Sequence, residues 1–164
     1  MIITNKSELE KVCSDTSIIE AHKTLSLLEQ SLTNSKTPGV GLAANQIGID
    51  AKVCIIRTNS KIDLVNPVIV EQYDLMEFER EGCLSFPGKY ILTKRYNEIL
   101  VKDLWQPAGL ILVGMDAVVA QHEIGHLYGK TMFEYQIERP QVNSVCWCGS
   151  GRKYKKCHMN KLIR

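Results

Sequence analysis

The sequence lacks a long apolar run, which limits the classes of protein that it can encode. Its longest mainly apolar stretch, residues 109–120, contains Asp116 and is shorter than a bilayer-spanning helix requires. The first residues also lack the basic-then-apolar order of a secretory signal. We therefore expect a cytoplasmic protein without membrane insertion.

The composition lacks the extremes that mark disordered, collagen-like or purely polar chains. Of the 164 residues, 45% are apolar and 23% are charged, which is typical of a globular protein. The length suits one compact domain with at most a small appended module.

Acidic residues are absent from residue 141 onward, whereas the first 140 residues hold more acidic than basic side chains. A basic tail on a mildly acidic body favours contact with RNA or with an acidic protein face. A solvated tail that is basic for solubility explains the charge equally well. The tail's six basic residues are Arg152, Lys153, Lys155, Lys156, Lys161 and Arg164.

Cysteine is present six times, and three of the six cluster near the end of the chain. Disulfides are rare among the reduced thiols of the cytoplasm, so metal ligation or catalysis is the better interpretation of clustered cysteines.

Hydrophobic periodicity predicts two helices separated by a strand-rich region. The first helix spans residues 17–32, with Ser17 and Glu20 as a capping box. The second spans residues 115–128 and is ended by Gly129. Between them we expect strands at 52–57, 62–70 (interrupted at Asn66-Pro67), 76–80, 90–94, 98–104 and 110–113.

The second predicted helix carries the pattern HExxH, formed by His122, Glu123 and His126. Histidines four residues apart share one helix face and can bind one cation, while the glutamate beside them can hold a water molecule. The alternative is two ordinary surface or core histidines.

A catalytic metal site needs a third protein ligand and an open position. In some zinc proteases the third ligand is a histidine six residues after the second histidine of HExxH. Met132 occupies that position here, and a thioether is a poor ligand for a hard metal. Cys83, within Glu81-Gly-Cys-Leu-Ser85, is the better candidate. Alone it would be read as a small buried hydrophobe; beside HExxH a thiolate ligand is favoured.

The segment Gly39-Val-Gly-Leu-Ala-Ala-Asn-Gln46 looks at first like a dinucleotide-binding loop, but no strand precedes it. Together with Glu81–Ser85 and Gln121–His126 it resembles the motifs GxGLAAxQ, EGCLS and QHExxH of the peptide deformylase family, in the same order. The resemblance implies an α+β fold in which mostly antiparallel sheets pack around a central HExxH helix.

The resemblance also implies roles for individual residues. Cys83, His122 and His126 would bind the metal, and Glu123 would be the general acid and base. The Gln46 side chain and the Leu84 backbone N–H would hold the formyl oxygen, and Glu81 would pair with Arg95. Fe²⁺ is the expected metal, while Zn²⁺, Ni²⁺ and Co²⁺ also suit two imidazoles and a thiolate.

The methionine of a formylated substrate requires an apolar pocket. Met115, Val118 and Val119 lie one to two helical turns before His122, and the resemblance adds Val40, Gly41 and Phe86. Plain core packing is the alternative, and we favour it for at least one of the helical residues.

This chain departs from the family pattern at Gly125, where an aspartate usually precedes the second histidine. A glycine within a helix costs about 1 kcal/mol relative to alanine, and any contact that the aspartate makes to the metal site is lost.

The end of the chain predicts a second metal site. Cys146, Cys148, Cys157 and His158 supply four ligands, which makes a closed, structural zinc site, and the Gly149–Gly151 segment allows a tight turn. The alternative is a flexible reduced tail. The segment resembles the SEC-C motif of the SecA translocation ATPase, which binds zinc and contacts the SecB chaperone or the ribosome.

We therefore expect a deformylase catalytic domain at residues 1–140 and a SEC-C-like zinc-binding tail at 141–164. The enzyme would remove the formyl group from the N-terminal methionine of nascent polypeptides and release formate, and the basic tail would tether it to the ribosome or to a SecB-like chaperone, in part through Trp147 or Tyr154. The alternatives are a small HExxH metalloprotease and a metal-stabilised adaptor in which the tail is the function.

Overall fold

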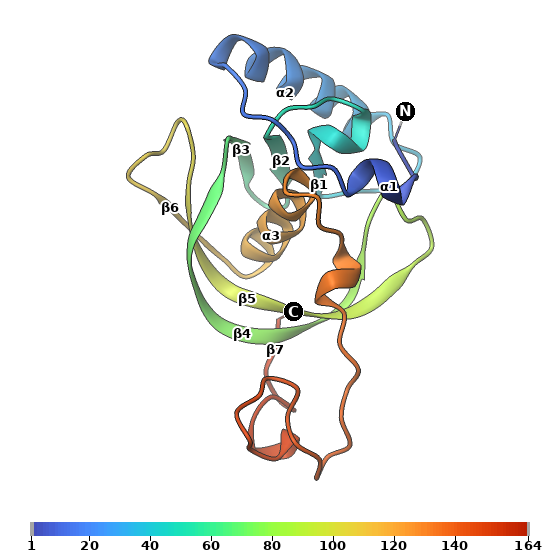
Figure 1. Cartoon of the computed structure of the whole chain (residues 1–164), viewed down its shortest axis with the longest axis vertical. Helices are drawn as coiled ribbons and strands as arrows, with labels where there is room; N and C mark the ends of the chain where they lie inside the picture. The colour runs from blue at the N-terminus through green and yellow to red at the C-terminus, as the bar shows by residue number, and fades with distance from the viewer. Residues whose placement is uncertain (1, 164) are drawn as a thin grey trace.

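The computed structural model describes residues 2–163, and its elements are stacked in layers (Figure 1). The helices are α1 (Lys6–Leu9), α2 (Ile18–Thr33) and α3 (Met115–Leu127), with short 3₁₀ helices η1 (Ala44–Ile47), η2 (Met132–Tyr135) and η3 (Tyr154–Lys156). The strands are β1 (Gly41–Ala43), β2 (Val53–Arg57), β3 (Lys61–Val65), β4 (Val68–Gly82), β5 (Tyr90–Lys102), β6 (Leu110–Val113) and β7 (Leu162–Ile163).

The layers run from α2 through a small sheet and α3 to a larger sheet and the C-terminal segment (Figure 1). The small sheet has the order β1-β2-β3 and is antiparallel. The larger sheet has the order β6-β5-β4-β7, antiparallel except where β7 pairs with β4. The predicted arrangement, mostly antiparallel sheets around the HExxH helix, is confirmed.

Helix α2 covers the outer face of the small sheet, as its apolar spacing predicts. Ala21 and Leu28 are fully buried against the small sheet. At its start the Ser17 hydroxyl oxygen accepts a hydrogen bond from the Glu20 N–H at 3.3 Å, and the hydroxyl donates to the Glu20 carboxylate at 3.0 Å. The predicted cap is present, although Glu20 accepts from the hydroxyl rather than from the backbone.

Helix α3 lies between the two sheets and is buried on nearly every side. Its apolar residues join one core cluster with residues from both sheets, including Ile56 and Ile99, which are fully buried. Because the helix ends at Leu127 and Gly129 follows with φ +69°, the predicted end is correct. The sandwiched position fixes both histidines of α3 relative to the strands.

The predicted strand boundaries in this region are wrong. The short strands expected at 76–80, 90–94 and 98–104 are parts of two long strands. β4 has 15 residues and β5 has 13, and they pair along their length. The register of β4 shifts between Ile69 and Glu71 and between Phe78 and Glu81, and Arg80 has φ +58°. These bulges break the alternation of apolar and polar residues in β4, so the sequence of this strand looks like separate strands.

The C-terminal segment packs on the larger sheet rather than extending away from it. β7 adds a parallel strand beside Glu77 and Phe78 of β4 (Figure 1). Within residues 2–163, no helix combines the length and the apolar character needed to cross a bilayer.

Candidate metal centres and active site

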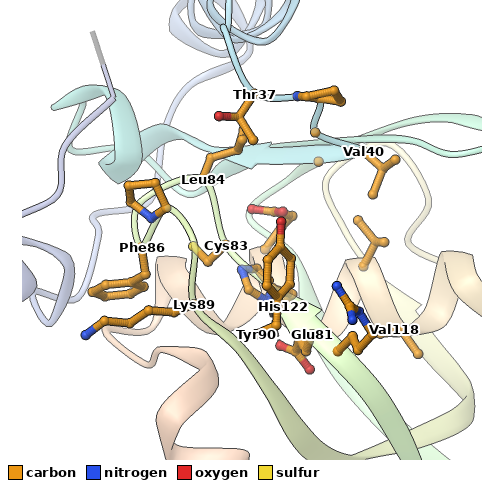
Figure 2. Close-up of a pocket in the computed structure, with 18 of the residues that line it drawn as sticks. Thr37, Val40, Glu81, Cys83, Leu84, Phe86, Lys89, Tyr90, Val118 and His122 are labelled. Carbon is orange, nitrogen blue, oxygen red and sulfur yellow. Dashed lines mark hydrogen bonds and ion pairs between the residues drawn. The ribbon is translucent and has the colours of Figure 1, made fainter.

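Three potential metal ligands converge where the end of β4 meets α3. Cys83 follows β4, and His122 and His126 lie one turn apart on α3. The Cys83 Sγ is 3.3 Å from the His126 Nε2, which is 3.2 Å from the His122 Nε2. Figure 2 shows Cys83 and His122 facing one another beside the pocket. One ion could therefore contact all three atoms.

The His122 ring is oriented by a buried carboxylate. His122 Nδ1 donates to the Glu81 Oε1 at 2.7 Å, which leaves Nε2 to face Cys83 and His126. Arg95 donates to both oxygens of Glu81, at 2.9 and 2.5 Å, and Thr93 adds a bond at 2.5 Å. Burial alone would raise the pKa of Glu81, but the Arg95 and His122 hydrogen bonds outweigh it and hold that pKa well below its ordinary value.

Glu123 lies beside the ligands with one carboxylate oxygen free. Its Oε2 is buried and has no hydrogen-bond partner within residues 2–163. Burial raises the pKa of Glu123 to about 7. A Cβ at Gly41 would come within 2.5 Å of the Glu123 Oε1, so only glycine lets β1 pass this close. A water molecule or substrate would satisfy the free oxygen.

Gln46 and Leu84 place hydrogen-bond donors around Cys83. The Ala43 N–H donates to the Gln46 Oε1 at 2.9 Å, which turns the amide nitrogen toward the site. That nitrogen donates to the Ser85 hydroxyl at 3.1 Å and lies 3.5 Å from the Cys83 Sγ. In the described part of the chain the Leu84 N–H donates to no acceptor.

A cavity of about 250 Å³ opens beside the three ligands (Figure 2). Val118 is 2% exposed and Val119 is 6% exposed, and Val119 also belongs to the core cluster, so it serves both packing and the pocket wall. All six predicted pocket residues line this cavity: Val40, Gly41, Phe86, Met115, Val118 and Val119.

Sequence reasoning missed the polar mouth of the cavity. Arg80, Lys89 and Tyr90 line the cavity and are exposed to solvent. No motif marks these positions, and Arg80 reaches the mouth only because of the bulge at the end of β4.

The position that departs from the family pattern faces a different cavity. Gly125 and Gln121 of α3 line a hollow of about 510 Å³ between this helix and strands β4 and β5. A Cβ at Gly125 would meet only Lys130, at 3.8 Å or more, so the site has room for a side chain.

The second cluster of ligands lies in the C-terminal segment. The His158 Nδ1 is 3.3 Å from the Cys146 Sγ and 3.2 Å from the Cys157 Sγ, and the Cys148 Sγ is 3.6 Å from the Cys157 Sγ. Four such atoms suit a tetrahedral zinc ion with no open position. The turn between them uses glycines with φ +77° and +72°, Gly149 and Gly151.

Side chains of the C-terminal segment fasten it to β4. The His158 Nε2 donates to the Leu75 carbonyl at 2.9 Å, which leaves Nδ1 for a metal. The Trp147 indole N–H donates to the Glu77 carboxylate at 2.7 Å, and Arg139 donates to it at 3.1 Å. Glu77 is fully buried.

Burial contradicts the expectation that Tyr154 meets a partner, whereas the same expectation for the partly exposed Trp147 stays a prediction. Tyr154 is only 2% exposed, and burial beside Glu77 raises its pKa to about 12. The Trp147 indole N–H is already used within the chain. Of the tail residues proposed for binding, Arg152, Lys153, Lys155 and Lys156 are exposed and Trp147 is partly exposed.

Within this fold, the first cluster has the features of the HExxH class of metallohydrolases. It has three protein ligands, a neighbouring glutamate with a free oxygen, and an adjoining cavity. The soft thiolate and two imidazoles fit Fe²⁺ or Zn²⁺ better than Mg²⁺ or Ca²⁺.

Comparisons with known proteins identify the family. The family described as polypeptide deformylase matches residues 1–141, and the SEC-C motif matches residues 143–160. This chain belongs to the peptide deformylase family.

Individual relatives agree with this assignment. A peptide deformylase of Aquifex aeolicus is 40% identical over 112 residues, covering 62% of this chain and 66% of that protein, just under two thirds of its length. One from Karelsulcia muelleri is 30% identical over 145 residues, covering 82% and 76%. The deformylase of the Vibrio parahaemolyticus bacteriophage VP16T, solved in complex with actinonin, has a TM-score of 0.69 and 34% identity, covering 79% of this chain and 98% of that one.

Proposed function

We propose that the protein removes the formyl group from the N-terminal methionine of nascent polypeptides in the cytoplasm by hydrolysis and releases formate. The observation that carries this proposal is the convergence of Cys83, His122 and His126 beside Glu123 and an apolar cavity. Membership of the deformylase family supports it.

Cys83, His122 and His126 would hold the metal, which we expect to be Fe²⁺. The unpartnered Oε2 of Glu123 and the converging ligand atoms fit such an ion. When bound, a divalent metal supplies Lewis acidity that lowers the pKa of a water molecule toward neutrality.

Glu123 would accept the proton of the attacking water and deliver it to the leaving amine. The Gln46 amide and the Leu84 N–H, both adjacent to Cys83, would stabilise the negative charge that develops on the formyl oxygen. Loss of one such donor costs about 2.7–4 kcal/mol in known enzymes. The apolar wall that includes Val118 and Phe86 would bind the methionine side chain.

Residues 1–140 would form the catalytic domain, and residues 141–164 a zinc-binding tail. In the tail, Cys146, Cys148, Cys157 and His158 would hold one structural zinc ion. The metal would organise a segment too short to build a core of its own.

The tail also supports a second function, tethering to the ribosome. Arg152, Lys153, Lys155 and Lys156 are exposed and no acidic residue follows residue 140, so the tail offers a cationic surface to RNA. Because the tail packs on β4, a variant with these four residues changed to glutamine is a better test than truncation. We expect wild type to co-sediment with ribosomes at low salt and the variant to remain in the supernatant. Equal pelleting of wild type and variant across a salt series would overturn the proposed tether to the ribosome. Pull-down of a SecB-like chaperone instead would show that the chaperone is the partner of the tail.

The catalytic proposal is tested with formyl-Met-Ala-Ser and protein purified without oxygen. We expect deformylation by wild type, none by Cys83→Ser, and activity retained by the matched variant Cys148→Ser, which alters the other cluster. Casein cleavage without deformylation would favour the metalloprotease alternative. Unchanged function in Glu123→Ala would favour the adaptor.

A further inference from the structure

The mouth of the active-site cavity carries a positive charge that the chain does not neutralise. Arg80 and Lys89 line the mouth, and neither forms an ion pair with another residue in the range 2–163. The cavity's acidic residues, Glu81 and Glu123, are 3% and 5% exposed, and Glu81 is already bonded to Arg95. A peptide that leaves the cavity therefore meets unpaired cations.

Arg80 lies at this mouth in a backbone conformation that is unfavourable for an arginine. Its φ of +58° lies in the left-handed region, which costs a residue other than glycine conformational energy. The bulge between Phe78 and Glu81 turns the strand here, and such bulges re-aim side chains beside active sites. The Arg80 guanidinium lies over the Tyr90 ring, 5.2 Å from its centroid. The side chain is thus positioned rather than free in solvent.

The charged neighbours of Arg80 and Lys89 do not pair with these two cations. Glu79, the residue before Arg80, pairs with Arg139 at 2.7 Å. Lys89 lies on the loop that follows Cys83 (Figure 2), with its ammonium group 5.6 Å from the centroid of the Phe133 ring. Neither cation is therefore neutralised by an acidic side chain within residues 2–163.

The direction of a substrate follows from the proposed function, on which this inference rests. With the formyl group at the three metal ligands and the methionine against the apolar wall, the next residues would leave the cavity past its exposed lining residues, which include Arg80 and Lys89. We propose that Arg80 and Lys89 make the site prefer formyl-methionyl peptides with an acidic side chain at the second or third position.

The test compares amidated peptides, because a free C-terminal carboxylate would itself attract the cations. The first set is formyl-Met-Asp-Ala-amide and its counterparts with the isosteric Asn or with Lys in place of Asp. The second set carries the same three residues at position three instead of position two. An exposed ion pair changes affinity by about 1.5-fold to 5-fold, so kcat/KM for Asp should exceed that for Asn by about this factor per cation contacted. The preference should vanish when the salt rises from about 0.01 M to 1 M, as the Debye length falls from about 30 Å to about 3 Å.

The variants isolate the two cations. Arg80→Gly should fold, because glycine suits the left-handed backbone conformation at this position. It should lower the ratio of kcat/KM for the Asp peptide to that for the Asn peptide toward one. Lys89→Gln should have the same effect. Lys102→Gln, which removes an exposed cation of β5 that does not line the cavity, should keep the wild-type ratio. Turnover of all peptides at equal kcat/KM would overturn this inference alone. No turnover of any peptide would overturn the proposed deformylase function and this inference with it.

Discussion

The two ligand clusters are built from similar atoms but differ in what surrounds them. The first has three ligands, a neighbouring glutamate with a free oxygen, and a cavity of about 250 Å³. The second has four ligands, borders neither of the two cavities described above within residues 2–163, and has hydrogen bonds that fasten it to β4. The comparison teaches that the number of ligands and the adjoining space, rather than the ligand type, separate a catalytic from a structural metal site.

The largest expected effect comes from removing the proton carrier of the first cluster. Glu123→Gln should lower kcat by about 10²- to 10⁴-fold, because general acid–base catalysis contributes that much. The ligands are untouched, so both metals should remain in elemental analysis. A variant with wild-type kcat on formyl-Met-Ala-Ser would contradict the role of Glu123.

The next effect comes from closing the space that the first cluster needs. A Cβ at Gly41 would lie 2.5 Å from the Glu123 Oε1, so Gly41→Ala should displace this carboxylate. A displacement of about 1 Å can cost about 10²-fold in rate. Steady-state kinetics measure the loss, and activity within twofold of wild type would show that β1 gives way instead.

The fastening of the second cluster should appear in stability rather than in rate. Trp147→Phe removes a hydrogen bond to the buried carboxylate of Glu77, and loss of a bond to a charged group costs about 1.5–3 kcal/mol. Denaturant unfolding should show this decrease. The control is Trp105→Phe, which changes an indole on the surface and should shift the free energy of unfolding by less than about 0.5 kcal/mol. Equal effects of the two changes would mean that the tail is not fastened through Trp147.

The smallest effect is a gain at Gly125, the residue of α3 that precedes His126. Since a Cβ there meets only ordinary contacts, Gly125→Ala should raise the free energy of unfolding by about 1 kcal/mol. Gly41→Ala should not raise the free energy of unfolding, so it is the control for Gly125→Ala. Destabilisation by Gly125→Ala would show that the 510 Å³ cavity beside it tolerates no side chain.

Much of the first cluster could be predicted because its chemistry lies in short contiguous motifs. HExxH places His122 and His126 on one helix face whatever the rest of the fold, and the segment around Cys83 stands out by its glycine. The helix ends were likewise predictable from periodicity and caps, whereas the fold class followed from the resemblance of these motifs to the peptide deformylase family.

What could not be predicted depends on contacts between distant segments. The continuity of β4 is hidden by bulges, and Arg80 lies in one of them. The packing of the tail rests on Trp147 and Glu77, 70 residues apart, and neither residue signals the other in the sequence.

The most direct measurement is a metal-resolved structure, using anomalous diffraction from crystals of protein purified without oxygen. The account predicts one ion about 2.0–2.3 Å from the Cys83 Sγ and the Nε2 atoms of His122 and His126, and a second ion among the four ligands of the tail. An ion absent from the first group, or bound there by a fourth side chain that closes the cavity, would contradict it.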